Sequence, residues 1–222
     1  MGEARGHHEG STRTARVYDW WSDHQRLFRA LRALAFAGRY GRLHRLAIDR
    51  LFAHAGQRVL DLGCGPGVNF PALAGAVGPG GRVVGVDASG GMVRRARTEA
   101  ASVDGACSVV RADAGTLPVP DAAFDRAFST LAVSAIPDGR AAVGEVARAL
   151  RPGGRFVVLD AQPFQTFPLT VCNPFVNPVS SWATDWHPHR DVPALLAERF
   201  DTVHVETFGG GTAFVATAEL AA

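Results

Sequence analysis

The sequence predicts an α/β protein built on a doubly wound, mostly parallel sheet of seven strands, with an antiparallel last strand and helices at the N-terminus. Two observations predict this fold. After Gly56, short runs that are apolar throughout alternate with amphipathic segments, a pattern typical of parallel strands covered by helices on both faces. Near the C-terminus, two runs are joined by little more than Gly209 to Gly211, and so short a connection requires antiparallel pairing.

The first 55 residues are expected to be helical after a short polar arm. Residues 1–14 are predicted to be disordered, and residues 15–222 to form a single domain. From Tyr18 to His54 there is no proline, and apolar residues recur at helical spacing. They are Leu27, Leu31, Leu34, Leu43, Leu46, Ile48 and Leu51. Two helices within residues 15–55, meeting near residues 38–41, account for this pattern.

The other elements follow along the chain. The predicted strands cover residues 58–62, 81–87, 107–113, 123–130, 154–161, 201–207 and 212–217. The predicted helices cover residues 67–77, 89–101, 138–150 and 192–199, and Ser89 is placed to cap the second of them. Residues 161–190 contain five prolines and five Phe and Trp residues. We expect them to form an irregular lid over the substrate, because long irregular loops in compact domains tend to be functional.

Composition and charge exclude several classes of protein. The 222 residues, 47% of them apolar, suffice for one buried core. A net charge of +2 does not require nucleic acid as a partner. Three widely spaced cysteines predict no metal site and favour the cytoplasm, and no apolar run reaches the ~18 residues of a membrane span. A small molecule is the expected partner, and a monomer or homodimer the expected state.

The strongest functional signal is VLDLGCGPG at residues 59–67, where a strand leads through Gly63, Gly65 and Gly67 into a helix. Without side chains, the backbone of such a turn approaches a ligand closely. Asp87 ends the next strand, where an acid accepts hydrogen bonds from a ribose. The spacing GxGxG differs from the dinucleotide fingerprint GxGxxG. Asp61 beside the turn repels a pyrophosphate and favours a cationic ligand with an amino group and a sulfonium.

Four segments resemble, in the correct order, the motifs of the class I S-adenosylmethionine-dependent methyltransferases. They are VLDLGCGPG (59–67), GVDASGGMV (85–93), RADAGTLPVPDAAFDRAFS (111–129) and ALRPGGRFVVLD (149–160). The chain is similar, over about residues 18–218, to the small-molecule branch (type 11) that includes the ubiquinone and menaquinone methyltransferases. This resemblance implies a Rossmann-like methyltransferase fold, S-adenosyl-L-methionine as the cofactor and no metal.

The resemblance also implies a cofactor site. Its residues would be Asp61, Gly63, Cys64, Gly65 and Gly67 at the methionine part, Asp87 at the ribose with Ala88 beside it, Met92, Asp113 and Ala114 at the adenine, and Ser129. Several of these also have a structural explanation. Met92 fits a core position, Asp113 a cap on the following turn, and Cys64 a small buried filler without a base beside it.

The acceptor of the methyl group is expected at the carboxyl ends of the strands. Two segments remain to enclose it, namely residues 18–24 and the predicted lid at 161–190, whose aromatic side chains would line an apolar pocket. A weakly acidic acceptor also requires a base. The candidate bases are His187, His189, His24 and Tyr18, and Ser129 and Thr130 follow the fourth strand at a place that touches both cofactor and acceptor.

Several functions stay open at this point. We favour methyl transfer to a carbon, oxygen or nitrogen atom of a small apolar or aromatic metabolite. A second hypothesis is methylation of a quinone or lipid at a membrane surface, because residues 11–58 hold ten arginines against three aspartates, together with Trp20 and Trp21. A helix that merely solvates its basic face explains the same residues, and we prefer it. A cyclase or cofactor-binding module of the same fold is a third hypothesis, and a nicotinamide enzyme is a fourth.

Overall fold

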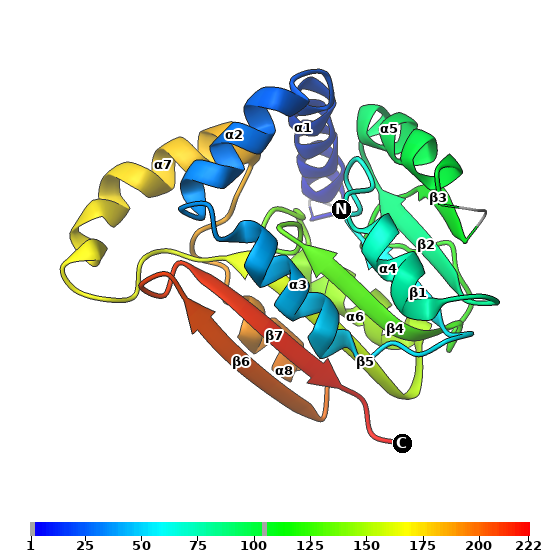
Figure 1. The fold of residues 1–222 in the computed structure, drawn as a ribbon. Coiled ribbons are helices and arrows are strands. Elements are labelled where there is room, and N and C mark those ends of the chain that lie inside the picture. Colours follow the sequence, from blue (N-terminus) through cyan, green and yellow to red (C-terminus); the bar gives the residue numbers. More distant parts are fainter. Residues whose placement is uncertain (1–2, 104–105) are drawn as a thin grey trace.

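A single mixed sheet organises the protein, and a computed structural model describes residues 3–103 and 106–222. The strands are β1 (Arg58–Leu62), β2 (Arg82–Asp87), β3 (Cys107–Arg111), β4 (Phe124–Thr130), β5 (Leu150–Ala161), β6 (Thr202–Phe208) and β7 (Ala213–Glu219). Their order is β3-β2-β1-β4-β5-β7-β6 (Figure 1). The first five are parallel, and β7 runs antiparallel to both of its neighbours. The predicted fold class is confirmed.

Helices cover both faces of this sheet. They are α1 (Glu3–Asp23), α2 (Gln25–Ala35), α3 (Tyr40–Leu51), α4 (Phe70–Val77), α5 (Gly90–Ala101), α6 (Gly139–Ala149), α7 (Asn173–Thr184) and α8 (Val192–Ala197), with a short 3-10 turn at Leu169–Cys172. Side chains of α3, α4 and α5 form one apolar core, and those of α6 and α8 form the other. Along β1, Val59 belongs to the first core and Leu60 to the second, as expected for a strand buried on both faces.

The N-terminal segment differs from the expectation of a disordered arm. Of residues 1–14, the structure describes those from Glu3 onward, and they belong to α1. The segment contains no proline and continues in the same helix to Asp19, which binds the start of α5. The Asp19 carboxylate accepts hydrogen bonds from the Ser89 hydroxyl (2.6 Å) and from the Gly91 N–H (2.7 Å). The predicted break at residues 38–41 is present, and a further break at His24 separates α1 from α2.

The predicted irregular lid at residues 161–190 is wrong in one respect, because it contains the regular helix α7. Pro174 lies in its first turn, where a missing N–H costs no hydrogen bond. The Asn173 side chain ties this helix end to the loop, since it donates to the Phe164 carbonyl oxygen and accepts from the Phe164 N–H, both at 2.9 Å. Asp185, in a left-handed conformation, ends the helix. Proline content alone therefore did not identify an irregular segment.

Candidate active site

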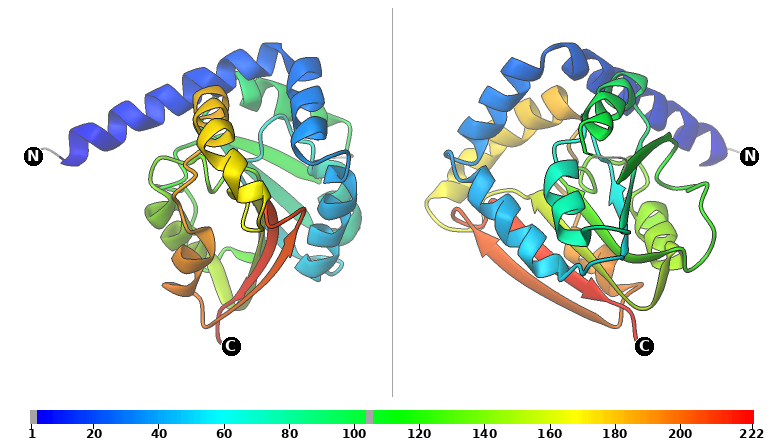
Figure 2. Two further views of the ribbon diagram at one scale, coloured as in Figure 1. Left: turned by 90° about the vertical axis from the view of Figure 1, so that its left-hand side faces the viewer. Right: turned by 45° about the vertical axis from the view of Figure 1, so that its right-hand side comes forward.

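The first cavity lies at the carboxyl ends of β1, β2 and β4, where the strand order reverses and ligands of open α/β sheets bind. Eight of the predicted cofactor residues line it: Gly63, Cys64, Gly65, Asp87, Ala88, Met92, Asp113 and Ala114. Thr14, Tyr18, Phe28, Arg32 and Tyr40 close it from the N-terminal helices. Figure 2 shows α1 and α2 crossing the end of the sheet. We refer to this space as the cofactor cavity.

The glycine turn has the backbone that its sequence predicts. Gly63 and Gly65 adopt φ angles of +64° and +54°, a region that side chains disfavour. A Cβ on Gly63 would lie 2.3 Å from the Ala132 Cβ, so β1 and the segment after β4 approach too closely for any side chain. A Cβ on Gly65, in contrast, would meet no heavy atom of the protein within 4 Å. Gly65 therefore leaves open space beside the cavity, which fits a ligand lying against its backbone.

Asp87 is held in one orientation by the turn. One carboxylate oxygen accepts from the Gly65 N–H and the other from the Ser89 N–H, each at 2.9 Å. Burial raises the pKa of Asp87 from its ordinary value to about 6, so the group is charged at neutral pH. Each oxygen retains a lone pair for a further donor. The predicted contact with the two hydroxyls of a ribose fits this arrangement.

The far end of the cofactor cavity is bounded by Met92 and by the loop after β3. Met92 is almost fully buried and also lines the cavity, so the core and adenine interpretations of this residue are compatible. One oxygen of Asp113 accepts from the Gly115 N–H at 2.8 Å, which matches the interpretation of a cap on the following turn. Asp113 and Ala114 of this loop both line the cavity.

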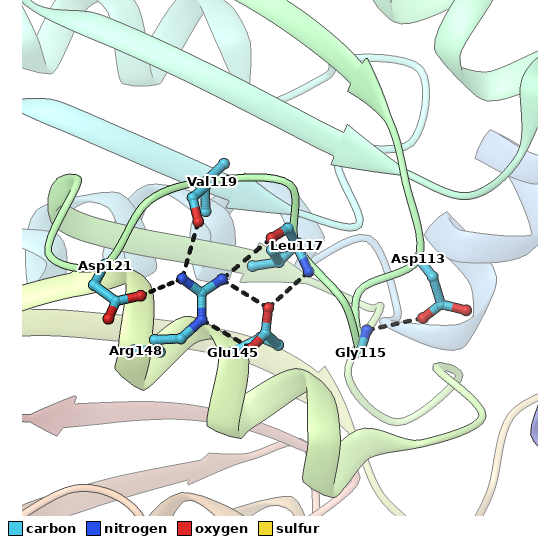
Figure 3. Close-up of polar contacts among 7 residues, drawn as sticks. All are labelled: Asp113, Gly115, Leu117, Val119, Asp121, Glu145 and Arg148. Carbon is cyan, nitrogen blue, oxygen red and sulfur yellow. Dashed lines mark hydrogen bonds and ion pairs between the residues drawn. The ribbon is translucent and has the colours of Figure 1, made fainter. Parts of the chain in front are cut away.

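An ion pair between Arg148 and Glu145 of α6 fixes the shape of that loop (Figure 3). The Arg148 guanidinium donates to the carbonyl oxygens of Leu117 (3.2 Å) and Val119 (2.9 Å) and to Asp121. Glu145 in turn accepts from the Leu117 N–H at 2.7 Å. The sequence did not indicate that this pair holds the loop, because Arg148 and Glu145 contact backbone atoms of Leu117 and Val119 about thirty positions away.

Three predicted cofactor residues lie outside the cavity wall. Gly67 has a φ of +86°, and a Cβ there would meet the Phe70 ring at 2.9 Å, so its role is in packing the turn. Ser129 is fully buried, and its hydroxyl has no hydrogen-bond partner among the described residues. The following residue, Thr130, lines the cavity instead.

Asp61, the third of them, is also fully buried. The Asn69 amide nitrogen donates to both of its oxygens, at 2.9 and 3.1 Å, and the Asn69 oxygen accepts from His44 at 2.8 Å. Burial raises the pKa of Asp61 to about 8. The carboxylate thus lies one layer behind the cavity, and its predicted contact with the methionine part stays a prediction.

A second cavity, of about 390 Å³, adjoins the first and is of the size that small ligands occupy. It lies between α2 and α7 at the ends of β5 and β7, and much of its lining is apolar: Leu31, Leu34, Phe36, Phe164, Val176, Val179 and Trp186. The two cavities share Tyr18, Phe28, Arg32, Leu131 and Ala135. We refer to this space as the acceptor cavity.

Of the four predicted bases, Tyr18 alone lines either of these two cavities within the described residues. Burial, together with the charges of Asp160 and Asp87, raises its pKa well above the ordinary value, so it stays protonated at neutral pH. His24 stacks on the Trp20 ring, with centroids 4.0 Å apart. His187 lies in a surface depression beside Arg190, and His189 lines neither that depression nor the two cavities.

Sequence reasoning missed Asp160 and Leu131. Asp160 is fully buried and lines the acceptor cavity. It accepts hydrogen bonds from the Ser134 hydroxyl (2.6 Å), the Ser134 N–H (2.8 Å) and the Ala161 N–H (2.8 Å). A signal was present, because Asp160 ends the apolar run of β5 as Asp87 ends that of β2. Leu131 adopts a left-handed conformation (φ +54°) where the cavities meet, and no sequence pattern indicates it.

Comparisons with known proteins agree with this geometry. A family model described as a methyltransferase domain matches residues 60–158. A demethylmenaquinone methyltransferase of Symbiobacterium thermophilum is 33% identical over 141 residues, which are 62% of this chain and 56% of that protein. A nocamycin O-methyltransferase of Saccharothrix syringae is 41% identical over 121 residues, 54% of this chain and 43% of that protein. The chain thus spans about half the length of these relatives or less.

Among solved structures, geranyl diphosphate C-methyltransferase from Streptomyces coelicolor, crystallised with S-adenosyl-L-homocysteine, has the same fold. The TM-score is 0.65 at 16% sequence identity, and the match covers 81% of this chain and 78% of that one. A model of the methyltransferase-domain family thus matches residues 60–158, and the likeness to this solved structure shows the same fold over most of the chain.

Proposed function

We propose that this protein transfers a methyl group from S-adenosylmethionine to a small apolar or aromatic acceptor. The observation that carries the proposal is the junction of the two cavities. One is bounded by a glycine turn and a fixed carboxylate, and the other is largely apolar. Tyr18, Leu131 and Ala135 line both, so a group held in the first can reach a molecule held in the second.

The residues of the cofactor cavity fit S-adenosylmethionine, which when bound supplies an electrophilic methyl group on sulfur. The open space at Gly65 admits the ligand against the backbone, and Asp87 accepts from the ribose hydroxyls. Met92 and the loop at Asp113 and Ala114 enclose the base. The chain itself positions the two reactants and keeps water away from the junction, which are the main requirements for a displacement of this kind.

The acceptor cavity contains one strong polar group, and we propose that it orients the acceptor. Asp160 is held by three donors from the protein. Burial raises the pKa of its carboxyl, and these hydrogen bonds oppose the shift. Among the described residues, Oδ2 accepts from the Ser134 N–H alone, so it retains capacity for one donor more. An otherwise apolar acceptor with one hydroxyl or amino group would pack against the apolar wall of the cavity and donate a hydrogen bond to Asp160.

Replacing Asp160 with asparagine is expected to lower kcat/KM for the acceptor by about tenfold, since one carboxyl oxygen is replaced by an amide nitrogen and a hydrogen bond to the acceptor is lost. The dissociation constant for S-adenosylhomocysteine should change little, because Asp160 does not line the cofactor cavity. Steady-state kinetics and calorimetry separate the two quantities. The matched control is Ser134→Ala, which removes one donor to Asp160 and keeps the carboxylate. Equal losses in both variants would contradict a direct role for Asp160.

Replacing Arg148 with methionine is expected to loosen the loop after β3. The carbonyl oxygens of Leu117 and Val119 lose their donor, and the affinity for S-adenosylhomocysteine should fall by about tenfold. Hydrogen exchange of residues 112–122 should become faster. Arg151→Met is the control, because Arg151 bonds Ala122 and Asp125 outside the cavity and its loss should leave affinity unchanged. Unaltered exchange in Arg148→Met would show that the ion pair does not hold the loop.

The proposed function can be tested before the acceptor is identified. The protein is incubated with methyl-labelled S-adenosylmethionine and a metabolite extract, and label should appear in a small product that is absent with Asp87→Ala. Tight binding of S-adenosylhomocysteine without any labelled product would favour a cyclase or a binding module. Calorimetry with NAD in parallel decides on the nicotinamide hypothesis, which requires NAD to bind more tightly than S-adenosylhomocysteine.

We further propose a location in the cytoplasm and a monomer or homodimer. The support for the location is that Cys64, Cys107 and Cys172 are all unpaired, as is usual in a reducing compartment. In the described part of the chain, no helix is both long and apolar enough to cross a membrane.

A further inference from the structure

Helix α7 presents an apolar surface to solvent. Its sequence, NPFVNPVSSWAT, contains no charged residue, and none of its side chains is buried. Phe175, Val179 and Trp182 are 76%, 65% and 79% exposed, and their spacing of four and three residues places them on one side of the helix. Phe167, just before the helix, is exposed to a similar degree. An exposed apolar patch of this kind marks an interaction site in soluble proteins.

Helix α2 presents a second apolar row within an arginine-rich stretch of the chain. Leu27, Leu31 and Leu34 are all exposed and again follow a spacing of four and three. Between Asp23 and Asp49 the chain contains six arginines and no acidic residue. Arg26 and Arg29 of α2 are exposed and form no ion pair with any residue of the described ranges.

The two rows belong to one surface, which we call the α2–α7 face (Leu27, Leu31, Leu34, Phe167, Phe175, Val176, Val179 and Trp182). Leu31, Leu34, Val176 and Val179 line the acceptor cavity and are at the same time exposed to solvent. They therefore form the rim of its opening. In Figures 1 and 2, α2 and α7 lie at the same end of the molecule, away from β3.

We propose that the α2–α7 face docks on the surface of an anionic lipid bilayer. Aromatic and aliphatic side chains enter the interface between headgroups and acyl chains, and neighbouring arginines attract the anionic headgroups. A second copy of the chain fits this face less well. In a twofold dimer the same patch meets itself, so the arginine-rich stretch between Asp23 and Asp49 would lie near its own copy without an acidic partner on α2 or α7.

Docking in this orientation has a consequence that rests on the proposed function. The rim of the acceptor cavity would face the membrane, so an apolar acceptor dissolved in the bilayer enters the cavity between α2 and α7 without crossing water. The sequence pointed to Trp20 and Trp21 as the membrane contact. Trp20 is 50% exposed, but Trp21 is buried and its indole N–H donates to the Ala183 carbonyl oxygen at 2.7 Å. Of these two side chains only Trp20 is thus open to a membrane, and we place the main contact on the α2–α7 face.

The test is flotation of the full chain with vesicles of phosphatidylcholine alone and of phosphatidylcholine mixed with phosphatidylglycerol. The wild type should float with the mixed vesicles and much less with the neutral ones, and added salt should weaken the binding. The double variant Phe175→Ser, Trp182→Ser should bind the mixed vesicles about tenfold more weakly. Arg26→Gln, Arg29→Gln should lower binding and its salt dependence together.

Two matched controls remove the same chemistry from other places. Phe52→Ser alters an exposed aromatic residue at the end of α3, and Arg95→Gln, Arg97→Gln removes two exposed charges of α5. Both should float like the wild type. Calorimetry with S-adenosylhomocysteine checks that each variant is folded. If the wild type did not bind S-adenosylhomocysteine, the proposed function would be contradicted. The flotation result would still decide on the membrane proposal.

A second measurement avoids disruptive substitutions. Brominated lipids in the mixed vesicles should quench the tryptophan fluorescence of the wild type, and Trp182→Phe should lose most of that quenching. Equal flotation of wild type and the Phe175, Trp182 variant, or quenching that survives Trp182→Phe, would overturn the proposal. A different result would also overturn it. Sedimentation would show a wild-type dimer that Phe175→Ser converts to a monomer, and neither the dimer nor the monomer would bind vesicles.

Discussion

Replacing Gly63 with alanine is expected to lower the free energy of unfolding by about 3 kcal/mol. Part of this cost, about 1 kcal/mol, comes from placing a Cβ at a φ of +64°. The larger part comes from packing, because the new Cβ would lie 2.3 Å from the Ala132 Cβ, and overpacking at such a site costs about 1–3 kcal/mol. In a chain of this size, thermal unfolding should shift down by roughly 10 °C.

The matched control is Gly65→Ala, two residues further along the same turn. Its φ is also positive, but no protein atom lies within 4 Å of the added Cβ. Its stability should therefore fall by only about 1 kcal/mol. Its affinity for S-adenosylhomocysteine should nevertheless drop by at least about tenfold, since the methyl group fills space that the ligand requires. If the two alanine variants unfolded at the same temperature, close packing at Gly63 would not be the reason for that glycine.

The sheet and the glycine turn could be predicted because their signals are local. A strand buried on both faces is apolar at most successive positions, and Val59, Leu60 and Leu62 show this around the buried Asp61. Ser89 could be recognised as a cap, and it does accept a hydrogen bond from the Met92 N–H at 3.0 Å. The positive φ of Gly63 is a local property of the turn, whereas its close approach to Ala132 depends on a distant segment and was not predicted.

Features that depend on distant contacts could not be predicted in this way. The carboxylate of Asp61 is covered by Asn69, eight residues later, and nothing in the motif indicates that an amide would occupy that place. Pro174 and Pro178 suggested irregular structure, although Pro174 begins a helix. The histidines were selected for their chemistry, and their positions depend on how α2 and the segment after α7 pack, which a single sequence does not show.

Replacing Asp87 with alanine is expected to weaken the binding of S-adenosylhomocysteine by about a hundredfold, the loss expected when hydrogen bonds to a charged acceptor are removed. Isothermal titration calorimetry at pH 7.5 measures this directly. Asp87→Asn keeps the size of the side chain and one acceptor oxygen but loses the charge, so its loss should be nearer tenfold. Thermal unfolding of both variants checks that the turn, whose Gly65 and Ser89 N–H groups bond Asp87, is still formed.

The pH dependence of the same binding tests the charge itself. Because burial raises the pKa of Asp87 to about 6, the carboxyl is protonated at pH 5 and then accepts a ribose hydroxyl poorly. Affinity of the wild type should fall by about tenfold between pH 7.5 and pH 5, and that of Asp87→Asn should stay nearly constant. The stability of the ligand-free protein has the opposite sign, since a raised pKa favours the folded state at low pH and loses that contribution as the pH rises through 6. Protonation of Asp87 at pH 5 does not lower the stability of the folded protein. Weaker binding at pH 5 would therefore reflect the lost charge of Asp87 and would identify its carboxylate as the partner of the ligand. Unchanged affinity in Asp87→Ala would remove the basis for placing the cofactor in this cavity.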